Sequence, residues 1–198
     1  MTKVLLIGDV HGNVDAYWKI LQQNKCDFSL QAGDFGFQKH HDWHLSNIDN
    51  AKHLIIFGNH DYWPYINEKH SCGYFTHIPN QNIMTIAGAY SIDQHHRILG
   101  RDYFKEEEMS FRMQNELIDY YTLVKPSIIV SHECPQSVRY NCFGIEQSSN
   151  TSRLLDALFH IHKPKLWIFG HHHKSLNTVL YDVNFICLNS LETMILDI

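Results

Sequence analysis

The sequence predicts an α/β fold in which two packed β-sheets are flanked by helices. In the first half of the chain, short runs of β-branched and large apolar residues, typical of buried strands, alternate with segments of helical periodicity. After residue 173 the chain contains only short strand-like runs. Alternating strands and helices followed by a β-rich tail are typical of sheets covered by helices. A chain of 198 residues can bury a sizeable core, so we expect a single domain over residues 1–198.

Short apolar runs define the expected strands. They lie at residues 4–7, 28–32, 54–57, 83–87, 127–130, 166–169, 177–181, 184–188 and 193–196. Five of these runs end in Gly or Ser, and a good metal ligand follows each one.

Helical spacing of apolar residues predicts a helix over Asn13–Asn24 and another over Glu107–Thr122. The polar stretch Ser149–Thr151 is a candidate cap for a helix that runs through Ile161. We also expect a short helix at His40–Ser46. Three segments are predicted to be irregular, the first of them a long loop with a short helical piece: Tyr62–Asn82, Gly88–Ser110 and Glu133–Asn150.

Metal-ligand residues follow the five runs directly. Open α/β sheets carry their sites at the carboxyl ends of the strands, so we expect the ligands at one edge of one sheet. The set contains three oxygen ligands and four histidines, with His60 in addition: Asp9, His11, Asp34, Asn59, His132, His171 and His173. Seven ligands are too many for one tetrahedral zinc ion but suit a site with two metal ions.

Composition narrows the possible partners and the location. The formal net charge of −5 gives no broad basic field, which disfavours binding of extended nucleic acid. Five cysteines are scattered without C-x-x-C spacing, as expected for reduced thiols inside a cell. No apolar stretch approaches the roughly 18 residues that span a membrane. We therefore expect a cytoplasmic protein with no membrane partner.

The ordered motifs Asp9-x-His11, Gly33-Asp34, Gly58-Asn59-His60-Asp61, His132 and Gly170-His171-x-His173 resemble those of the calcineurin-like metallophosphoesterases. The motifs occur in the order of that family and extend from residue 8 to residue 173. The resemblance implies a four-layer α/β/β/α sandwich with the metal site at the carboxyl ends of the strands.

The resemblance also implies a role for each ligand. Asp9, His11 and His173 would hold a first metal ion, Asn59, His132 and His171 a second, and Asp34 would bridge the two. Carboxylate, imidazole and amide ligands suit Mn, Fe, Zn or Ni, with Mn expected in vitro. A metal-bridging hydroxide would attack phosphorus, and His60 would stabilise or protonate the leaving oxygen. Catalysis is thus assigned to Asp34 and His60.

One motif departs from the pattern of the protein Ser/Thr phosphatases in this family. Those enzymes carry Gly-Asp-x-x-Asp-Arg-Gly, whereas this chain has Phe37 in place of the second Asp and lacks the Arg. The difference disfavours a protein phosphatase and favours the branch that acts on phosphodiesters and nucleotides. The segment Gly88–Asp93 with Arg97 and Arg101 also resembles small phosphoesterases of phages and bacteria.

Several residues near the motifs have two interpretations. Arg97 either grips phosphate, together with Asn59 and His60, or forms an ion pair with the acidic residues Glu106–Glu108. Asp61 either positions nearby backbone or forms a salt bridge, and His172 is expected to face solvent or pack on the sheet. The remaining candidates are expected to be surface histidines, loop aromatics that pack on the core rather than stack a base, and ordinary thiols: His40, His41, His44, His95, His96, Tyr62, Trp63, Tyr65, Cys134 and Cys142.

The leading hypothesis from the sequence is a two-metal phosphoesterase acting on a small phosphodiester or nucleotide. A nuclease is disfavoured by the acidic chain, and a protein phosphatase by Phe37. A non-catalytic interaction scaffold on the same fold is disfavoured by the intact ligand set. The oligomeric state is left open.

Overall fold

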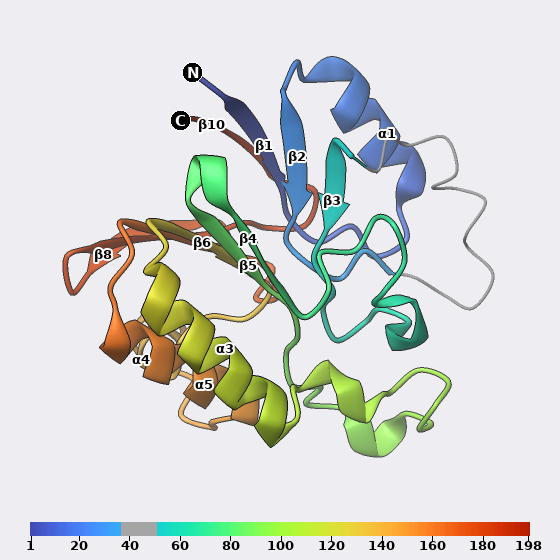
Figure 1. Cartoon of the computed structure of the whole chain (residues 1–198). Helices are drawn as coiled ribbons and strands as arrows, with labels where there is room; N and C mark the ends of the chain where they lie inside the picture. The colour runs from blue at the N-terminus through green and yellow to red at the C-terminus, as the bar shows by residue number, and fades with distance from the viewer. Residues whose placement is uncertain (37–50) are drawn as a thin grey trace.

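The structure is a computed structural model that describes residues 1–36 and 51–198 (Figure 1). The short helix expected at His40–Ser46, the three histidines of that segment and Phe37 lie outside the described residues. The expected architecture of two sheets flanked by helices is confirmed.

A four-stranded sheet holds both ends of the chain, in the order β10-β1-β2-β3. Strands β1 (Lys3–Ile7), β2 (Phe28–Gln31) and β3 (His53–Ile55) are parallel, and β10 (Thr193–Asp197) runs antiparallel to β1. Helix α1 (Val14–Gln23) connects β1 to β2 on the outer face of this sheet (Figure 1). Its first turn is capped by Asn13, whose side chain accepts a hydrogen bond from the Ala16 backbone N–H.

A six-stranded sheet packs against the first, in the order β4-β5-β6-β7-β9-β8. Its strands are β4 (Phe75–Ile78), β5 (Ile83–Ile86), β6 (Ile128–Ser131), β7 (Leu166–Phe169), β8 (Leu176–Leu180) and β9 (Val183–Cys187). Strands β5, β6, β7 and β9 are parallel, and the two edge strands are antiparallel to their neighbours.

Three helices cover the outer face of the six-stranded sheet (Figure 1): α3 (Phe111–Val124), α4 (Gln136–Phe143) and α5 (Asn150–Ile161). Alternate residues of one strand therefore belong to different cores. On β6, Ile128 and Val130 join the core between the sheets, whereas Ile129 joins the core beneath the helices. A strand that is buried on both faces has a continuous apolar sequence, and this pattern is why β6 was predicted.

Two predicted loops contain regular structure, which corrects the sequence analysis. The segment Tyr62–Asn82 includes β4 and two short 3₁₀ helices, Trp63–Tyr65 and Pro79–Gln81. β4 was missed because all of its residues are half-buried on an edge strand and show no alternation. The segment Glu133–Asn150 includes α4, which begins after Pro135 and ends at Gly144 (φ 68°).

The predicted start of the helix Glu107–Thr122 was wrong. α3 begins at Phe111 and is capped by Ser110, so Glu107 lies outside it, in a 3₁₀ helix at Lys105–Glu107. The segment Gly88–Ser110 is otherwise irregular, as expected, with a further 3₁₀ helix at Gln94–His96. Among the described residues, no helix has the length and apolar character needed to cross a membrane.

Candidate metal centre

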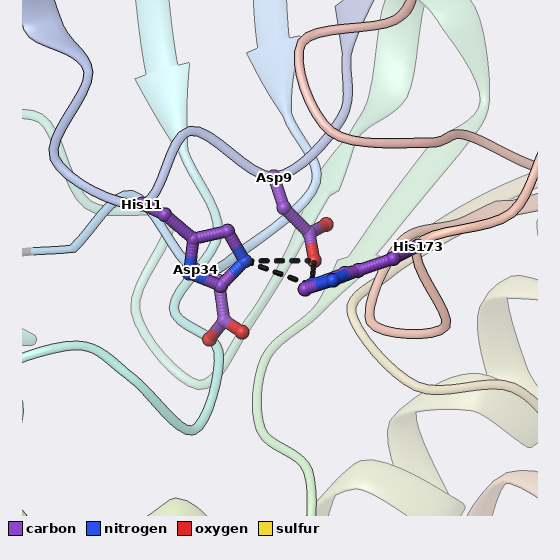
Figure 2. A group of neighbouring side chains, drawn as sticks. All are labelled: Asp9, His11, Asp34 and His173. Carbon is purple, nitrogen blue, oxygen red and sulfur yellow. Dashed lines mark hydrogen bonds and ion pairs between the residues drawn. The ribbon is translucent and has the colours of Figure 1, made fainter.

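Four of the expected ligands converge beyond the ends of β1, β2 and β7 (Figure 2). The donor atoms of Asp9, His11, Asp34 and His173 all lie within 4.8 Å of one another. His173 Nε2 is 3.1 Å from Asp9 Oδ2, and 2.8 Å separate the Nε2 atoms of His11 and His173. Asp9 and Asp34 are buried, whereas the two histidines are partly exposed, so the group is open to solvent on the histidine side.

A second group of donors shares Asp34 with the first. The donor atoms of Asp34, His132 and His171 also lie within 4.8 Å of one another. His132 Nε2 is 3.2 Å from Asp34 Oδ1 and 3.3 Å from Asn59 Oδ1. The structure thus brings together all seven predicted ligands, with the carboxylate of Asp34 between the two groups.

The ligands do not lie at the edge of one sheet, as the sequence analysis expected. Asp9, Asp34 and Asn59 follow strands of the four-stranded sheet, whereas His132 and His171 follow β6 and β7 of the six-stranded sheet. Backbone-to-side-chain hydrogen bonds join the two sheets at this point. The ring Nδ1 of His132 is 2.8 Å from Ala32 O, and the His171 backbone N–H donates to Asp9 Oδ1 at 3.1 Å. The site therefore lies where the carboxyl ends of both sheets meet.

The backbone is strained at four of the ligands. His11, Asp34, His171 and His173 have φ between 48° and 66°, a region that non-glycine residues seldom adopt. Such strain persists only where the surroundings impose it, and it clusters at functional sites.

Two glycines make room for the ligands. A Cβ at Gly58 would collide with Asp34 Oδ1 and His132 Nε2, and a Cβ at Gly170 would collide with Asp9 Oδ1. Glycine at these strand ends lets the two sheets bring their ligands into contact.

Asp34 and His132 form a buried charged pair. Burial opposes ionisation of Asp34, but the nearby His132 outweighs it and holds the pKa of the carboxyl well below its usual range. Burial likewise opposes protonation of His132, yet the charge of Asp34 raises its pKa to about 10. The carboxylates therefore concentrate negative charge that a cation or a proton must offset.

The chemistry of the donors fits divalent metal ions. Buried carboxylates and an amide oxygen face imidazole nitrogens across less than 5 Å, with two histidine nitrogens pointing at each other. Imidazole suits Zn, Fe or Ni, and carboxylate or amide oxygen suits Mn. The arrangement can thus hold cations of this class at each of the two groups.

Asp61 positions the backbone of two ligand-bearing loops. Its carboxylate accepts hydrogen bonds from the backbone N–H groups of Gly36 at 2.7 Å, Gly58 at 2.8 Å and Phe35 at 3.3 Å. The loop after β2 carries Asp34 and the loop after β3 carries Asn59, so one carboxylate fixes both. The positioning role expected of Asp61 therefore has contacts among the described residues.

A buried relay, which sequence analysis missed, orients the side chain of Asn59. The amide Nδ2 donates to Ser91 Oγ at 3.2 Å, and Ser91 Oγ donates to Glu107 Oε2 at 2.6 Å. Glu107 Oε1 accepts from the Phe104 backbone N–H at 2.9 Å. Burial raises the pKa of Glu107 to about 7. With Nδ2 held by Ser91, the amide oxygen of Asn59 is left facing His132.

Arg97 lies against His60, not against the acidic cluster Glu106–Glu108. Its Nη1 donates to Asn59 O at 3.0 Å, and its Nη2 lies 3.0 Å from His60 Nε2 and 2.8 Å from Asp93 Oδ1. Burial lowers the pKa of His60, and the positive charge of Arg97 acts in the same direction. His60 also donates its backbone N–H to Asp34 Oδ1 at 2.8 Å.

His172 is half-buried and lines the cavity, but its side chain is only 7% exposed and packs on aromatic residues. Its ring stacks on Phe143 with centroids 4.2 Å apart, and its Nε2 is 2.9 Å from Glu133 Oε1. Glu133 Oε2 lies 3.7 Å from His171 Nε2 and 3.3 Å from Arg139 Nε. Glu133 follows the ligand His132 directly, a position that could have drawn attention to it, whereas Arg139 belongs to the unpredicted helix α4.

The aromatic residues of the segment after Asp61 pack as expected. Trp63 is buried and donates its indole N–H to Gly58 O at 3.0 Å, while Tyr62 contacts Tyr65 and Phe104 edge to face. Cys134 is fully buried and its sulfur is 3.6 Å from His172 Nε2. Glu133, Cys134 and His172 form a third group of potential donors, but the guanidinium of Arg139 already supplies positive charge there.

Comparison with known proteins gives the family. A sequence model of the calcineurin-like phosphoesterases matches residues 2–175, most of the chain. The chain belongs to this family. It is therefore a phosphoesterase of the hydrolase class by family, and the family uses divalent metal ions. No curated protein sequence matches it significantly.

Several solved structures share its fold at low sequence identity. A dimetal phosphatase from Danio rerio is similar with a TM-score of 0.61 and 14% identity, over 96% of this chain and 88% of that chain. The Thermus thermophilus protein TT1561 is similar with a TM-score of 0.60 and 16% identity, over 96% and 90%. A phosphopantetheinyl hydrolase from Mycobacterium tuberculosis is similar with a TM-score of 0.54 and 13% identity, over 95% of this chain and 89% of that chain.

Proposed function

We propose that this calcineurin-like phosphoesterase is a binuclear enzyme that hydrolyses a small phosphodiester or a nucleotide-type phosphate ester. One observation carries the proposal: two groups of donor atoms share the carboxylate of Asp34. Two cations about 3.5–4 Å apart repel each other, and a shared carboxylate offsets that repulsion. A single-metal site would have no use for the second group of donors.

Each ligand has a place in this proposal. Asp9, His11 and His173 would hold one cation, Asn59, His132 and His171 the other, and Asp34 both. Mn, Fe, Zn or Ni suits the donors, and Mn is the ion to use in vitro. When bound, the cations supply positive charge to the phosphoryl oxygens and lower the pKa of water.

His60 serves the leaving oxygen. Its backbone is fixed by the hydrogen bond to Asp34, and its ring lines the cavity beside the metal ligands. The lowered pKa leaves the ring neutral at pH 7, so that one ring nitrogen carries a proton and can donate a hydrogen bond. An anionic phosphoryl group beside the ring raises its proton affinity, which prepares His60 to protonate the departing oxygen.

Arg97 binds the phosphoryl group and holds His60 in place. It is anchored by Asn59 O and Asp93, so its guanidinium is fixed before substrate arrives. A preorganised charge stabilises a transition state without further reorganisation. We expect Arg97→Ala to lower kcat/KM because it removes both the contact to the phosphoryl group and the contact that holds His60.

The shape and charge of the molecule favour a small substrate. The cavity beside the ligands has a volume of about 390 Å³, at the lower end of the range for small-molecule sites. The net charge of −5 favours neither a nuclease on extended DNA or RNA nor an acidic phosphoprotein as substrate. The intact ligand set also argues against a purely structural role.

The test is hydrolysis of bis-p-nitrophenyl phosphate beside p-nitrophenyl phosphate by the Mn-loaded protein. We expect cleavage of the diester to exceed that of the monoester, and Asp34→Asn and His60→Ala to lose most of it. A monoesterase would cleave only the second compound. Failure to cleave either compound, with two metal ions bound per chain by elemental analysis, would contradict the proposal and favour a scaffold.

A further inference from the structure

Two arginines from different elements line the cavity beside the candidate metal ligands. Arg97, from the irregular segment after β5, and Arg139, from α4, both line it. The proposed hydrolysis needs positive charge at the scissile phosphoryl group, where Arg97 contacts His60. Arg139 belongs to a different element and has no part in that step.

Arg139 has unused hydrogen-bond donors although it is almost fully buried. Its side chain is 6% exposed. Nη1 donates to Gln147 O at 3.0 Å and Nε lies 3.3 Å from Glu133 Oε2, whereas Nη2 has no hydrogen-bond partner among the described residues. Buried guanidinium groups are normally satisfied, so a lining arginine with free donors indicates a group that arrives from the cavity.

The charges behind the two arginines differ. Asp93 pairs with Arg97, lines the cavity and has a side chain that is 49% exposed, so it repels further anions on that side. Glu133 pairs with Arg139 but is completely buried and does not line the cavity. The carboxylate that pairs with Arg139 thus lies behind the cavity wall, whereas the carboxylate that pairs with Arg97 lies on it.

Apolar and aromatic side chains also line this cavity. Tyr90, Ile92 and Ile145 line the same cavity, and Ile92 is 70% exposed. Ile145 follows α4 and donates its backbone N–H to Arg139 O at 3.4 Å. An exposed isoleucine and a tyrosine at a cavity rim suit the apolar or planar part of a ligand.

We propose that Arg139 binds a second phosphate of the substrate, apart from the phosphoryl group that is cleaved. The substrate class is then a nucleotide-type phosphate ester that carries a terminal phosphate, with its apolar part against Tyr90, Ile92 and Ile145. This inference rests on the proposed function and narrows its substrate. Arg139 is a specificity residue here, since it does not touch the reacting atoms.

The test compares two chromogenic diesters that differ only in a terminal phosphate. They are thymidine 5′-(4-nitrophenyl phosphate) and the same compound with a 3′-phosphate, assayed with the Mn-loaded full chain. A hydrogen bond to a charged group is worth about tenfold or more in binding. We expect the KM of the wild type to be about tenfold lower for the 3′-phosphate compound, with similar kcat. Equal KM values in the wild type would overturn the inference and leave the proposed function intact.

Variants assign the effect to Arg139. Arg139→Gln is expected to bring the two KM values together, Arg139→Lys to keep part of the difference, and Arg112→Gln, an exposed arginine on α3, to keep all of it. A full preference in Arg139→Gln would contradict the inference. Removal of the buried charge could unfold Arg139→Gln. In that case the KM values of the two diesters, measured in the wild type and in Arg139→Lys, still test the inference.

A binding measurement separates failure of the inference from failure of the proposed function. If neither diester is hydrolysed, the proposed function fails. Calorimetry on the Mn-loaded protein then compares thymidine 3′,5′-bisphosphate with thymidine 5′-phosphate. About tenfold tighter binding of the bisphosphate, lost in Arg139→Gln, would support the second phosphate site, and equal affinities would overturn it.

Discussion

At the scale of single residues, Asp61 shows how one side chain can organise a site without touching the substrate. It accepts three backbone N–H groups from two loops that carry ligands. In Asp61→Asn, one accepting oxygen becomes an amide nitrogen, so at least one buried N–H loses its partner. We expect the free energy of unfolding to fall by about 1–3 kcal/mol and metal affinity to weaken.

Urea denaturation and calorimetric titration with Mn²⁺ would measure both effects of Asp61→Asn. Asp119→Asn, at an exposed position on α3, is the matched control and should change neither quantity. Unchanged metal affinity in Asp61→Asn would refute the positioning role.

The buried carboxyl of Glu107 should make the free energy of unfolding depend on pH. Burial raises its pKa to about 7 from 4.5, so between these values the folded state binds more protons than the unfolded state. Stability contributed by this group is therefore lost as pH rises from about 4.5 to about 7, and the loss is constant above that. In Glu107→Gln the titration is absent.

The measurement for Glu107 is a double difference in unfolding free energy. Between pH 5 and pH 8, the stability of Glu107→Gln relative to the wild type should rise by about 2 kcal/mol. Using metal-free protein for both keeps the ligands out of the comparison. A relative stability that stays flat between the two pH values would show that Glu107 titrates normally.

The convergence of the candidate metal ligands could be predicted from the sequence, but their supporting contacts could not. Each candidate ligand comes shortly after an apolar run, so local pattern and chemistry point to it. The relay from Asn59 through Ser91 to Glu107 joins residues 32 and 16 positions apart, and no local pattern records such contacts. Arg139 was missed for a different reason, since the helix that carries it has few strong helix formers.

At the scale of elements, helix α5 illustrates a prediction that local chemistry does support. Ser149 caps its first turn by accepting from the Ser152 backbone N–H at 3.0 Å, and Ser152 Oγ accepts from the Ser149 backbone N–H at 2.9 Å. Ser149→Ala removes the cap and should lower the free energy of unfolding by about 1 kcal/mol.

Thermal unfolding of Ser149→Ala beside Ser148→Ala would test the cap. Ser148 is exposed and lies one residue earlier, so its replacement should change stability by less than about 0.5 kcal/mol. Equal effects of the two replacements would mean that the cap contributes nothing.

The elements that escaped prediction are those that depend on neighbours. β4 is a strand because β5 offers it a hydrogen-bonding edge, with Phe75 opposite Ile86 and Ile78 opposite Ile83. α4 is stabilised by contacts to other elements, which its own sequence does not predict. One of them is the Ser137 hydroxyl, which donates to Asp156 of α5 at 2.6 Å. Tertiary contacts override weak intrinsic propensity in both cases.

At the scale of the whole molecule, the site joins two sheets. Ligands from the four-stranded sheet face ligands from the six-stranded sheet, so a bound cation bonds to both. Ligands that bind only the folded state stabilise it by mass action, by about 2.7 kcal/mol at a hundred times Kd. For a chain of this size that corresponds to about 5–10 °C in Tm.

We therefore expect Mn²⁺ to raise the Tm of the metal-free protein and EDTA to reverse the change. Asp34→Asn should lose most of the shift, whereas Ser148→Ala should keep it. Differential scanning calorimetry measures all three. A wild-type Tm that does not respond to saturating Mn²⁺ would contradict metal binding at this site.

The two-sheet architecture was predicted, whereas the placing of all ligands on one sheet was wrong. Strand-end ligands imply only that the ends of the strands meet. Which strands share a sheet depends on pairing across long sequence separations, such as β7 with β9 and β1 with β10. Pattern along the chain does not contain that information.

The pairing of β1 with β10 has a consequence for how the protein is made. Lys3 pairs with Asp197 and Ile7 with Thr193, so β1 acquires one of its two neighbours only from β10, which is synthesised long after it. Until β10 has left the ribosome, β1 has an exposed edge that invites pairing with other chains. Asp9 and His11, which follow β1, can be held in their final positions only once β10 has paired. Assembly of the candidate metal centre is thereby postponed until after the synthesis of β10.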